Sequence, residues 1–463
     1  MTVATDLAWL GVAEAGRLLR AGDIGAVELT EATLAWIDRT EPFVHTFVAL
    51  DVDGARAAAR VAEAELAAGL DRGPLHGIPY SVKDLVAVAG LPLRAGSRAV
   101  DGTVPAIDAA VISSLREAGA ICLGKVATHE FAWGMHSDPA RNPWDGERLS
   151  GGSSGGSGSA VAAGQGAFSI GTDCGCSVRA PAALNGVCAI RPTHGRVAMD
   201  GVVPLSMTMD NVGPLARSAE DVALILDAIA DGWTWEPPQT DDLVGLRLGV
   251  PRGYFFEAIQ PGVAAAVEAA IDVLRGLGAE VVDVELERAA QAAPVDVAIV
   301  NSESAVLLED LAADRGGDLG DDVRAQLALG RAISARDYLR GQQLRTLIGE
   351  DFARVFGDVD AIVTPTVPAV AQRHNGSLFI DVEFPGGTTE DVGWTYCRYT
   401  FPMSVAGVPT VAVPCGLSEG LPAGISIAAR QFGEATALRV ALAYQRVTDH
   451  HRQRPPALME ATA

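Results

Sequence analysis

The sequence predicts an α/β fold in a single large domain. Segments with the pattern of buried strands alternate with segments of helical periodicity along most of the 463 residues. No internal repeat and no linker with a shift in composition divides the chain. Hydrophobic residues make up 49% and charged residues 20%, which is typical of a globular core and excludes a disordered chain.

The first third of the chain begins with helices. Residues 27–40 place Val27, Leu34 and Ile37 at helical spacing, and residues 53–70 are rich in alanine, a strong helix former. Glycine and proline then mark turns before a predicted strand. The expected elements are helices over 27–40, 53–70 and 108–118, and strands over 80–88 and 120–126.

The rest of the chain continues the alternation. Residues 217–230 form an amphipathic pattern that Ser218 is expected to cap, with acidic residues in the first turn. The further expected elements are strands over 245–251 and 359–370, a helix followed by a strand over 262–286, and a strand pair over 407–416 and 422–432.

Charge and cysteine content limit the classes of function. The formal charge of −23 repels phosphate backbones and anionic lipids, so we expect neither a nucleic-acid nor a membrane partner. The first residues lack the basic and apolar pattern of a signal peptide, and no apolar run of about 20 residues predicts a membrane span. Six cysteines in so long a chain favour free thiols, and a cytoplasmic location is expected.

A stretch rich in glycine and serine, residues 149–197, admits three interpretations. As a flexible linker it would need polar flanks, but small apolar residues that look like a buried helix and strand follow it. As a nucleophile elbow it contains G-x-S-x-G around Ser153 and Ser154, but the polar residues before it do not form a central strand.

The third interpretation combines two serines with a lysine. Ser153 and Ser177 flank the stretch, and Lys83 lies upstream among apolar residues. A serine hydroxyl needs a base to become a nucleophile, and a buried lysine can be that base because burial disfavours its charged form. Glycines allow backbone N–H groups to approach a developing oxyanion. The alternatives are turn or capping roles for the serines, and a charged Lys83 paired with Asp84.

The sequence resembles the amidase signature family over nearly its whole length. The motifs that carry the resemblance occur in the family's order. They are GPLHGIPYSVKDL (73–85), GGSSGGS (151–157), GTDCGCSVRAPA (171–182), RPTHGRV (191–197), MDNVGPLARSAEDVA (209–223), DAIVTPTVP (360–368) and GVPTVAVPCG (407–416).

The resemblance implies a Ser–cis-Ser–Lys triad and a metal-free hydrolysis of amides. Ser177 would be the nucleophile that forms an acyl-enzyme, Ser153 the bridging serine after a cis peptide bond, and Lys83 the general base. The implied oxyanion hole is made by the backbone N–H groups of Cys174, Gly175, Cys176 and Ser177, and the implied supporting residues are Ser154, Asp173 and Arg179.

The implied fold is one amidase signature domain over residues 1–463, with a mixed, mostly parallel sheet covered by helices on both faces. We expect a helical segment over about 1–70, a core that carries the triad over about 71–230, and a C-terminal part that shapes the substrate site over about 231–455. The expected lining of an acyl pocket is Ala132, Trp133, Met135 and His136.

Two cysteines depart from the family's pattern. The family places a small or apolar residue at the position of Cys174 and a glycine at that of Cys176, so Cys176 is expected to narrow the acyl site. The C-x-C spacing has no second pair of ligands beside it, so no metal or other cofactor is predicted.

Three functions follow from the resemblance. The first is a stand-alone amidase that hydrolyses the C–N bond of a small carboxamide or carbamoyl compound, for which the family allows a homodimer. The second is the glutaminase subunit of a tRNA-dependent amidotransferase, where the same triad releases ammonia for a partner. The third is an acyl-transfer member of a biosynthetic pathway. The departures from the consensus and the negative charge favour the first.

Overall fold

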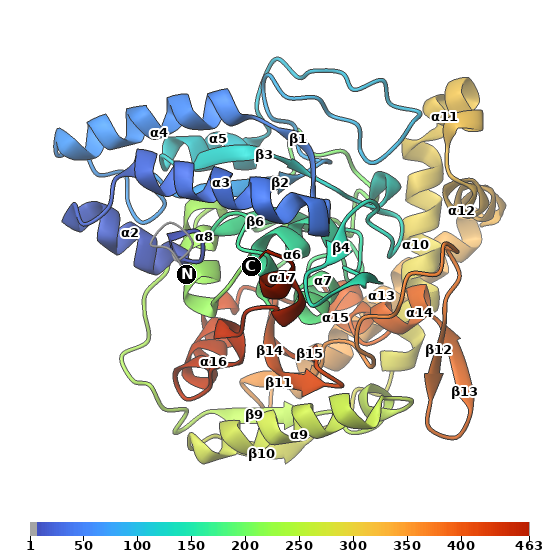
Figure 1. Cartoon of the computed structure of the whole chain (residues 1–463). Coiled ribbons are helices and arrows are strands. Elements are labelled where there is room, and N and C mark those ends of the chain that lie inside the picture. The colour runs from blue at the N-terminus through green and yellow to red at the C-terminus, as the bar shows by residue number, and fades with distance from the viewer. Residues whose placement is uncertain (1–6, 463) are drawn as a thin grey trace.

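An 11-stranded sheet runs through the whole molecule and receives strands from every part of the chain (Figure 1). The computed structural model describes residues 7–462. In order across the sheet, the strands are β1 (Phe47–Leu50), β3 (Ile121–Val126), β2 (Pro79–Lys83), β6 (Phe168–Asp173), β8 (Asn211–Ala216), β7 (Cys188–Arg191), β14 (Thr410–Ser418), β15 (Leu421–Ala429), β11 (Ala361–Pro365), β9 (Arg247–Val250) and β10 (Glu280–Asp283).

The sheet is mixed, as predicted, but parallel pairs do not predominate. Parallel neighbours occur towards its two ends, where β2 lies between β3 and β6, and β9 lies between β11 and β10. The six strands from β6 to β11 across the middle pair in antiparallel fashion, and so do β1 and β3 at one edge. The prediction of a mostly parallel sheet was therefore wrong in this detail, because antiparallel pairs between distant strands, such as β7–β14 and β11–β15, build the centre together with the hairpin β14–β15.

Helices cover both faces of the sheet, which confirms the predicted α/β class. Along β14, Val411 and Val413 belong to the core shared with α9, whereas Ala412 between them belongs to the core shared with α6 and α7. Adjacent residues of a strand point to opposite faces, so these helices lie on opposite sides. The longer helices are α2 (Val12–Ala21), α3 (Ala26–Val44), α4 (Val52–Ala67), α5 (Ala110–Glu117), α6 (Gly155–Ala162), α7 (Arg179–Asn185), α8 (Ala219–Ile229), α9 (Pro261–Gly276), α10 (Ala292–Leu307), α11 (Glu309–Arg315), α12 (Asp321–Ala332), α13 (Ala335–Val355) and α16 (Glu434–Arg446).

Several expected elements are present with small shifts. The capping of α8 is confirmed, since Asp221 N donates to Ser218 Oγ at 3.0 Å. The strand pair β14–β15 is confirmed as an antiparallel hairpin. The strand expected over 80–88 ends already at Lys83, because the next residues turn away from the sheet.

The N-terminal part is helical apart from β1, which adds an edge strand to the sheet through β3. Residues 1–6 and 463, the two ends of the predicted domain, lie outside the described residues. The three-part division of the chain stays a prediction. Among residues 7–462, none of the helices combines the length and the apolar character needed to cross a bilayer.

A buried ion pair links β3 to the turn after β2. Lys125 Nζ lies 2.9 Å from Asp84 Oδ1, and the two side chains are 0% and 5% exposed. The other oxygen of the carboxylate accepts from Arg94 N at 3.2 Å. Since Asp84 is engaged in this way, its charge is directed to Lys125 and not to the preceding Lys83.

We predict that Asp84→Leu lowers the free energy of unfolding by about 3–5 kcal/mol, because it leaves the Lys125 ammonium buried without a counter-charge. The double variant Asp84→Leu/Lys125→Met should recover most of that loss, since it removes both charges. Denaturant unfolding of the three proteins checks this. An equal decrease in the free energy of unfolding in the single and double variants would contradict this, because the decrease would then not come from the unpaired Lys125 charge.

Candidate active site

The glycine- and serine-rich stretch forms part of the interior. Every residue from 149 to 193 is buried, and the stretch contains α6, β6 and α7. The helix α6 packs closely against the backbone around Ala127. Gly156 makes this approach possible, because a Cβ there would lie 2.5 Å from the Ala127 carbonyl oxygen. The linker interpretation is therefore wrong.

The nucleophile-elbow interpretation fails on topology. The strand before the motif is β5 (Asp145–Leu149), which belongs with β4 (Arg141–Asn142) to a separate two-stranded sheet and not to the 11-stranded sheet. An elbow needs a central strand directly before the serine. Of the three interpretations, the lysine with two serines remains.

Lys83 and Ser153 meet in the interior although 70 positions separate them. Lys83 is the last residue of β2, and its amine donates to Ser153 Oγ at 2.7 Å and to Thr172 Oγ1 at 2.8 Å. Both Lys83 and Ser153 are 0% exposed. The amine is thus fixed by two hydroxyl oxygens and is shielded from water.

Burial lowers the pKa of Lys83 to about 7. Desolvation is the largest cause, and the carboxylates of Asp210 and Asp173 oppose it by favouring the ammonium. An amine with this pKa is substantially neutral near pH 7, and its lone pair is then available to accept a proton.

The backbone before Ser153 is packed too tightly for a side chain. The Gly152–Ser153 peptide is cis, as expected. A Cβ on Gly152 would lie 2.4 Å from the Gly134 carbonyl oxygen and 2.6 Å from Met135 Cα. Glycine at position 152 therefore allows the backbone of Gly134 and Met135 to pack directly against the residue that precedes Ser153.

Ser177 follows β6 in the loop that leads into α7, and it is 4% exposed. Ser154 joins this loop to the stretch that carries Ser153, since Ser154 N donates to Ser177 O at 3.1 Å. The Ser154 hydroxyl also bonds to the backbone of Thr172, at 3.1 Å to its oxygen and 3.2 Å from its nitrogen. These bonds bring the segments of the two candidate serines together.

The loop before Ser177 presents a row of backbone donors. Within the described chain, the N–H groups of residues 174–177 have no protein acceptor, whereas the next donor, Val178 N, is bonded to Asp173 Oδ2 at 3.1 Å. Unpaired N–H groups beside a nucleophile are the arrangement that stabilises an oxyanion.

Asp173 and Arg179 hold the loop from behind. Arg179 binds both carboxylate oxygens of Asp173 at 2.9 Å, and it also donates to the Gly175 carbonyl oxygen at 2.9 Å. Both side chains are fully buried, and although burial raises the pKa of Asp173, the attraction of Arg179 and Arg191 leaves it below its usual value. The Gly175 oxygen also accepts from Ser404 Oγ at 2.8 Å, so the N–H of Cys176, which belongs to the same planar trans peptide unit, points away from this side.

Cys176 contacts other sulfur atoms. Its Sγ lies 3.0 Å from Cys397 Sγ and 3.9 Å from both Met135 Sδ and the Gly152 carbonyl oxygen. Burial and the neighbouring Asp210 and Asp296 raise the pKa of Cys174 well above its usual value. Both cysteines are buried, so alkylating reagents have little access to either thiol in the folded protein.

The four residues expected to line an acyl pocket are all buried, but the contacts of their side chains differ. Met135 lies at the site, beneath Gly152 and against Cys176. Ala132 and Trp133 share the apolar cluster that contains Cys174 and Cys176. His136 turns towards another segment, where its Nε2 lies 3.1 Å from the Leu378 carbonyl oxygen.

Sequence reasoning missed three residues of the site. Thr172 binds the Lys83 amine, Asp210 favours its charged form, and Cys397 contacts Cys176. Asp210 lies within the quoted motif MDNVGPLARSAEDVA, and Thr172 directly precedes Asp173, so their motifs were a signal for both. No signal in the sequence pointed to Cys397, which is 221 positions from its partner.

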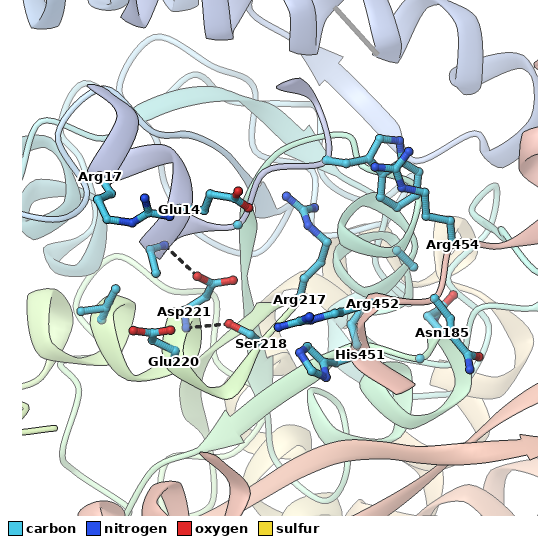
Figure 2. A pocket seen from close by; sticks show the side chains of 18 of the residues that line it. Glu14, Arg17, Asn185, Arg217, Ser218, Glu220, Asp221, His451, Arg452 and Arg454 are labelled. Atoms are coloured by element: carbon cyan, nitrogen blue, oxygen red, sulfur yellow. Dashed lines mark hydrogen bonds between the residues drawn. The ribbon is translucent and has the colours of Figure 1, made fainter. Parts of the chain in front are cut away.

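A cavity of about 830 Å³ lies elsewhere in the molecule, and Figure 2 shows its charged lining. Arg17 and Glu14 from α2, Asp221 at the start of α8 and Arg452 near the C-terminus point into it. Asp221 accepts from Ala13 N at 2.8 Å and thereby ties α2 to α8. None of the candidate site residues lines this cavity, so it is separate from the lysine–serine site.

Comparison with known proteins finds the same family over most of the chain. A family model described as Amidase matches residues 28–438. A glutamyl-tRNA(Gln) amidotransferase subunit from Chloroflexus aurantiacus is 42% identical, over 97% of this chain and 99% of that protein. A crystal structure of an amidase has 32% identity and a TM-score of 0.87, covering 94% of this chain and 99% of that one. The crystal structure of the corresponding amidotransferase subunit from Thermotoga maritima has 28% identity and a TM-score of 0.78, with 96% of each chain covered.

These relatives correct the prediction about partners. A small amide and a second copy of the chain, without nucleic acid, were the partners expected from the sequence. The Chloroflexus aurantiacus protein, a similar protein from Roseiflexus castenholzii and the Thermotoga maritima protein are instead subunits of an amidotransferase that is named for a tRNA. The net charge of one chain does not exclude such an assembly, because other subunits can supply a basic surface.

We predict that kcat/KM for amide hydrolysis rises with pH through about 7 and levels off above it, because protonated Lys83 cannot accept a proton. Asp210→Asn removes a charge that raises the pKa of Lys83, so the rising limb should move to lower pH. Asp314→Asn, a change at an exposed acid, should leave it in place. A limb that stays fixed in Asp210→Asn, or a flat profile from about pH 5 to 8, contradicts a lysine base.

Proposed function

The chain belongs to the amidase signature family, and from this premise we propose that it is the amide-hydrolysing subunit of an amidotransferase. Its substrate would be glutamine, and the ammonia released would pass to a partner that amidates glutamyl-tRNA. The carrying observation is 42% identity, spanning 97% of this chain, to one subunit of such an enzyme. The cytoplasmic location inferred from the cysteine content stays a prediction.

The first half of the proposed reaction forms the acyl-enzyme. Neutral Lys83 accepts the proton of Ser153 as Ser153 accepts that of Ser177, and the Ser177 oxygen attacks the amide carbon. The 2.7 Å contact between the Lys83 amine and Ser153 supports the first of these transfers. The unpaired N–H groups of residues 174–177 would stabilise the negative charge that develops on the carbonyl oxygen.

Collapse of the intermediate breaks the C–N bond. The proton returns from Lys83 through Ser153 to the leaving nitrogen, ammonia departs, and the acyl group stays on Ser177 as an ester. Water then attacks the ester with the same base, and the carboxylic acid leaves. The sum is glutamine and water converted to glutamate and ammonia, with the enzyme restored.

A different carboxamide is the second candidate substrate. Sulfur atoms of Cys176, Met135 and Cys397 gather beside the loop that carries Ser177, and such a soft, apolar wall suits an apolar acyl group better than a charged amino acid. The TM-score of 0.87 to the amidase, against 0.78 to the amidotransferase component, also favours this alternative.

An assay of ammonia release separates the two substrates. We predict that the chain hydrolyses glutamine when it is combined with the remaining amidotransferase subunits from the same source, and that it does so more slowly alone. A panel of other carboxamides is measured in parallel. Rapid hydrolysis of another carboxamide, with no glutamine hydrolysis in either preparation, would contradict the proposal and support the second candidate.

We predict that Ser177→Ala lowers kcat by more than about 1000-fold, because no other hydroxyl replaces the nucleophile. The matched control is Ser159→Ala in the same buried stretch, whose hydroxyl bonds to the Arg141 carbonyl oxygen and should leave kcat within about threefold. Circular dichroism of both variants verifies their folding. Ser177→Ala with the activity of the parent would rule out the acyl-enzyme.

A further inference from the structure

Three possible metal ligands converge from two segments that are far apart in the sequence. His136 and Asp138 lie in the loop before β4, and His374 lies between β11 and the hairpin strand β12 (Asp381–Phe384). Their ligand atoms all lie within 4.8 Å of one another. His374 Nε2 and Asp138 Oδ2 are 3.5 Å apart.

We infer that His136, Asp138 and His374 form a binding site for a divalent transition-metal cation such as Zn²⁺. Imidazole and carboxylate are ordinary zinc ligands, and three protein ligands with a water as the fourth are a common set. Bonds of about 2.1 Å in a tetrahedron place neighbouring ligand atoms about 3.4 Å apart, which the separation of His374 and Asp138 nearly matches. The sequence predicted no metal, because the cysteines lack a second pair at ligand spacing and the histidines are scattered along the chain.

Two of the three ligands already have outer partners that orient them. His136 Nε2 lies 3.1 Å from the Leu378 carbonyl oxygen, and a proton donated there leaves Nδ1 unprotonated and able to bind a metal. Asp138 Oδ1 accepts from Arg141 at 2.5 Å, and this leaves Oδ2 for the cation. Such partners are typical of protein metal sites.

The third ligand requires a local change. Gly376 N donates to His374 Nδ1 at 3.2 Å, and coordination through Nε2 places a proton on Nδ1. This hydrogen bond must therefore break when a cation binds. Residues 375–379 are exposed, so the turn has space to shift, and the half-exposed Asp138 gives an entry path from solvent.

His129 does not serve as a fourth ligand, because both its nitrogens are engaged. Nε2 lies 2.8 Å from Asp322 Oδ2, and Nδ1 lies 2.7 Å from the His136 carbonyl oxygen. This histidine instead fixes the backbone of His136. Arg141 is the positive side chain paired with Asp138, and it weakens the attraction for a cation without blocking the free oxygen.

A cation at this site would join two segments next to the candidate active site. Met135, directly before His136, supports Gly152 and contacts Cys176. His374 leads into the β12 hairpin, which stands at the edge of the molecule (Figure 1). The cation would thus hold the loop at the active site to this hairpin segment, and the inference does not depend on which amide is the substrate.

The test is a titration of the chelator-treated full-length protein with Zn²⁺ in competition with a chromogenic zinc indicator. We predict one site per chain, with affinity lowered more than about 100-fold by His374→Ala and by Asp138→Asn. His45→Asn is the matched control, since it removes an exposed histidine in a left-handed conformation that asparagine tolerates, and it should bind as the parent does.

Thermal unfolding without zinc verifies that the variants fold, which is expected because Asp138 and His374 are solvent-accessible. Zinc should raise the unfolding temperature of the parent and of His45→Asn but not that of the two ligand variants. Absence of stoichiometric binding to the parent would overturn the inference. Binding unchanged in both ligand variants would also overturn it, because the cation would then lie elsewhere.

Discussion

The proposed chemistry depends on one buried lysine amine that can lose its proton near neutral pH. Lys83 is fully buried and is fixed by two hydroxyl oxygens, and burial brings its pKa to about 7. A lysine whose pKa stayed near its ordinary value would be an ammonium and could not accept a proton. The ion pair between Asp84 and Lys125 contributes to this arrangement. It engages the Asp84 carboxylate, which would otherwise stabilise the ammonium form of Lys83.

Small residues allow the segments around this amine to meet. Glycine at 152 and 156 lets two backbone segments approach within distances that any Cβ would prevent. Behind the loop, the buried Asp173–Arg179 pair fixes the backbone, because Arg179 donates to the Gly175 carbonyl oxygen and Asp173 accepts from Val178 N. Bare backbone in the interior is thus a requirement of the site, and conformational flexibility is not its purpose.

The sequence predicted the class of fold, because hydrophobic periodicity is a local signal. Its motifs named Lys83 and Ser153, which lie in contact, and the roles of the three candidate triad residues stay predictions. The predicted length of the strand that contains Tyr80 was too great. Apolar residues continue beyond Lys83, but the strand ends there because Asp84 turns towards Lys125. The sequence did not predict the contact of Cys176 with Cys397 or the approach of His374 to Asp138, because packing of distant segments produces them. Strand direction in the middle of the sheet likewise depends on pairing between strands that are distant in the sequence, which periodicity does not encode.

The central claim is that the Ser177 hydroxyl becomes acylated with Lys83 as base. Mass spectrometry of the protein, quenched in acid during turnover of a slowly hydrolysed amide and then digested, tests it most directly. We expect the mass of the acyl group on the peptide that contains Ser177, with fragmentation locating it on that serine. Fragments that place the acyl group on Cys176, or an unmodified peptide at every time of quenching, would contradict it.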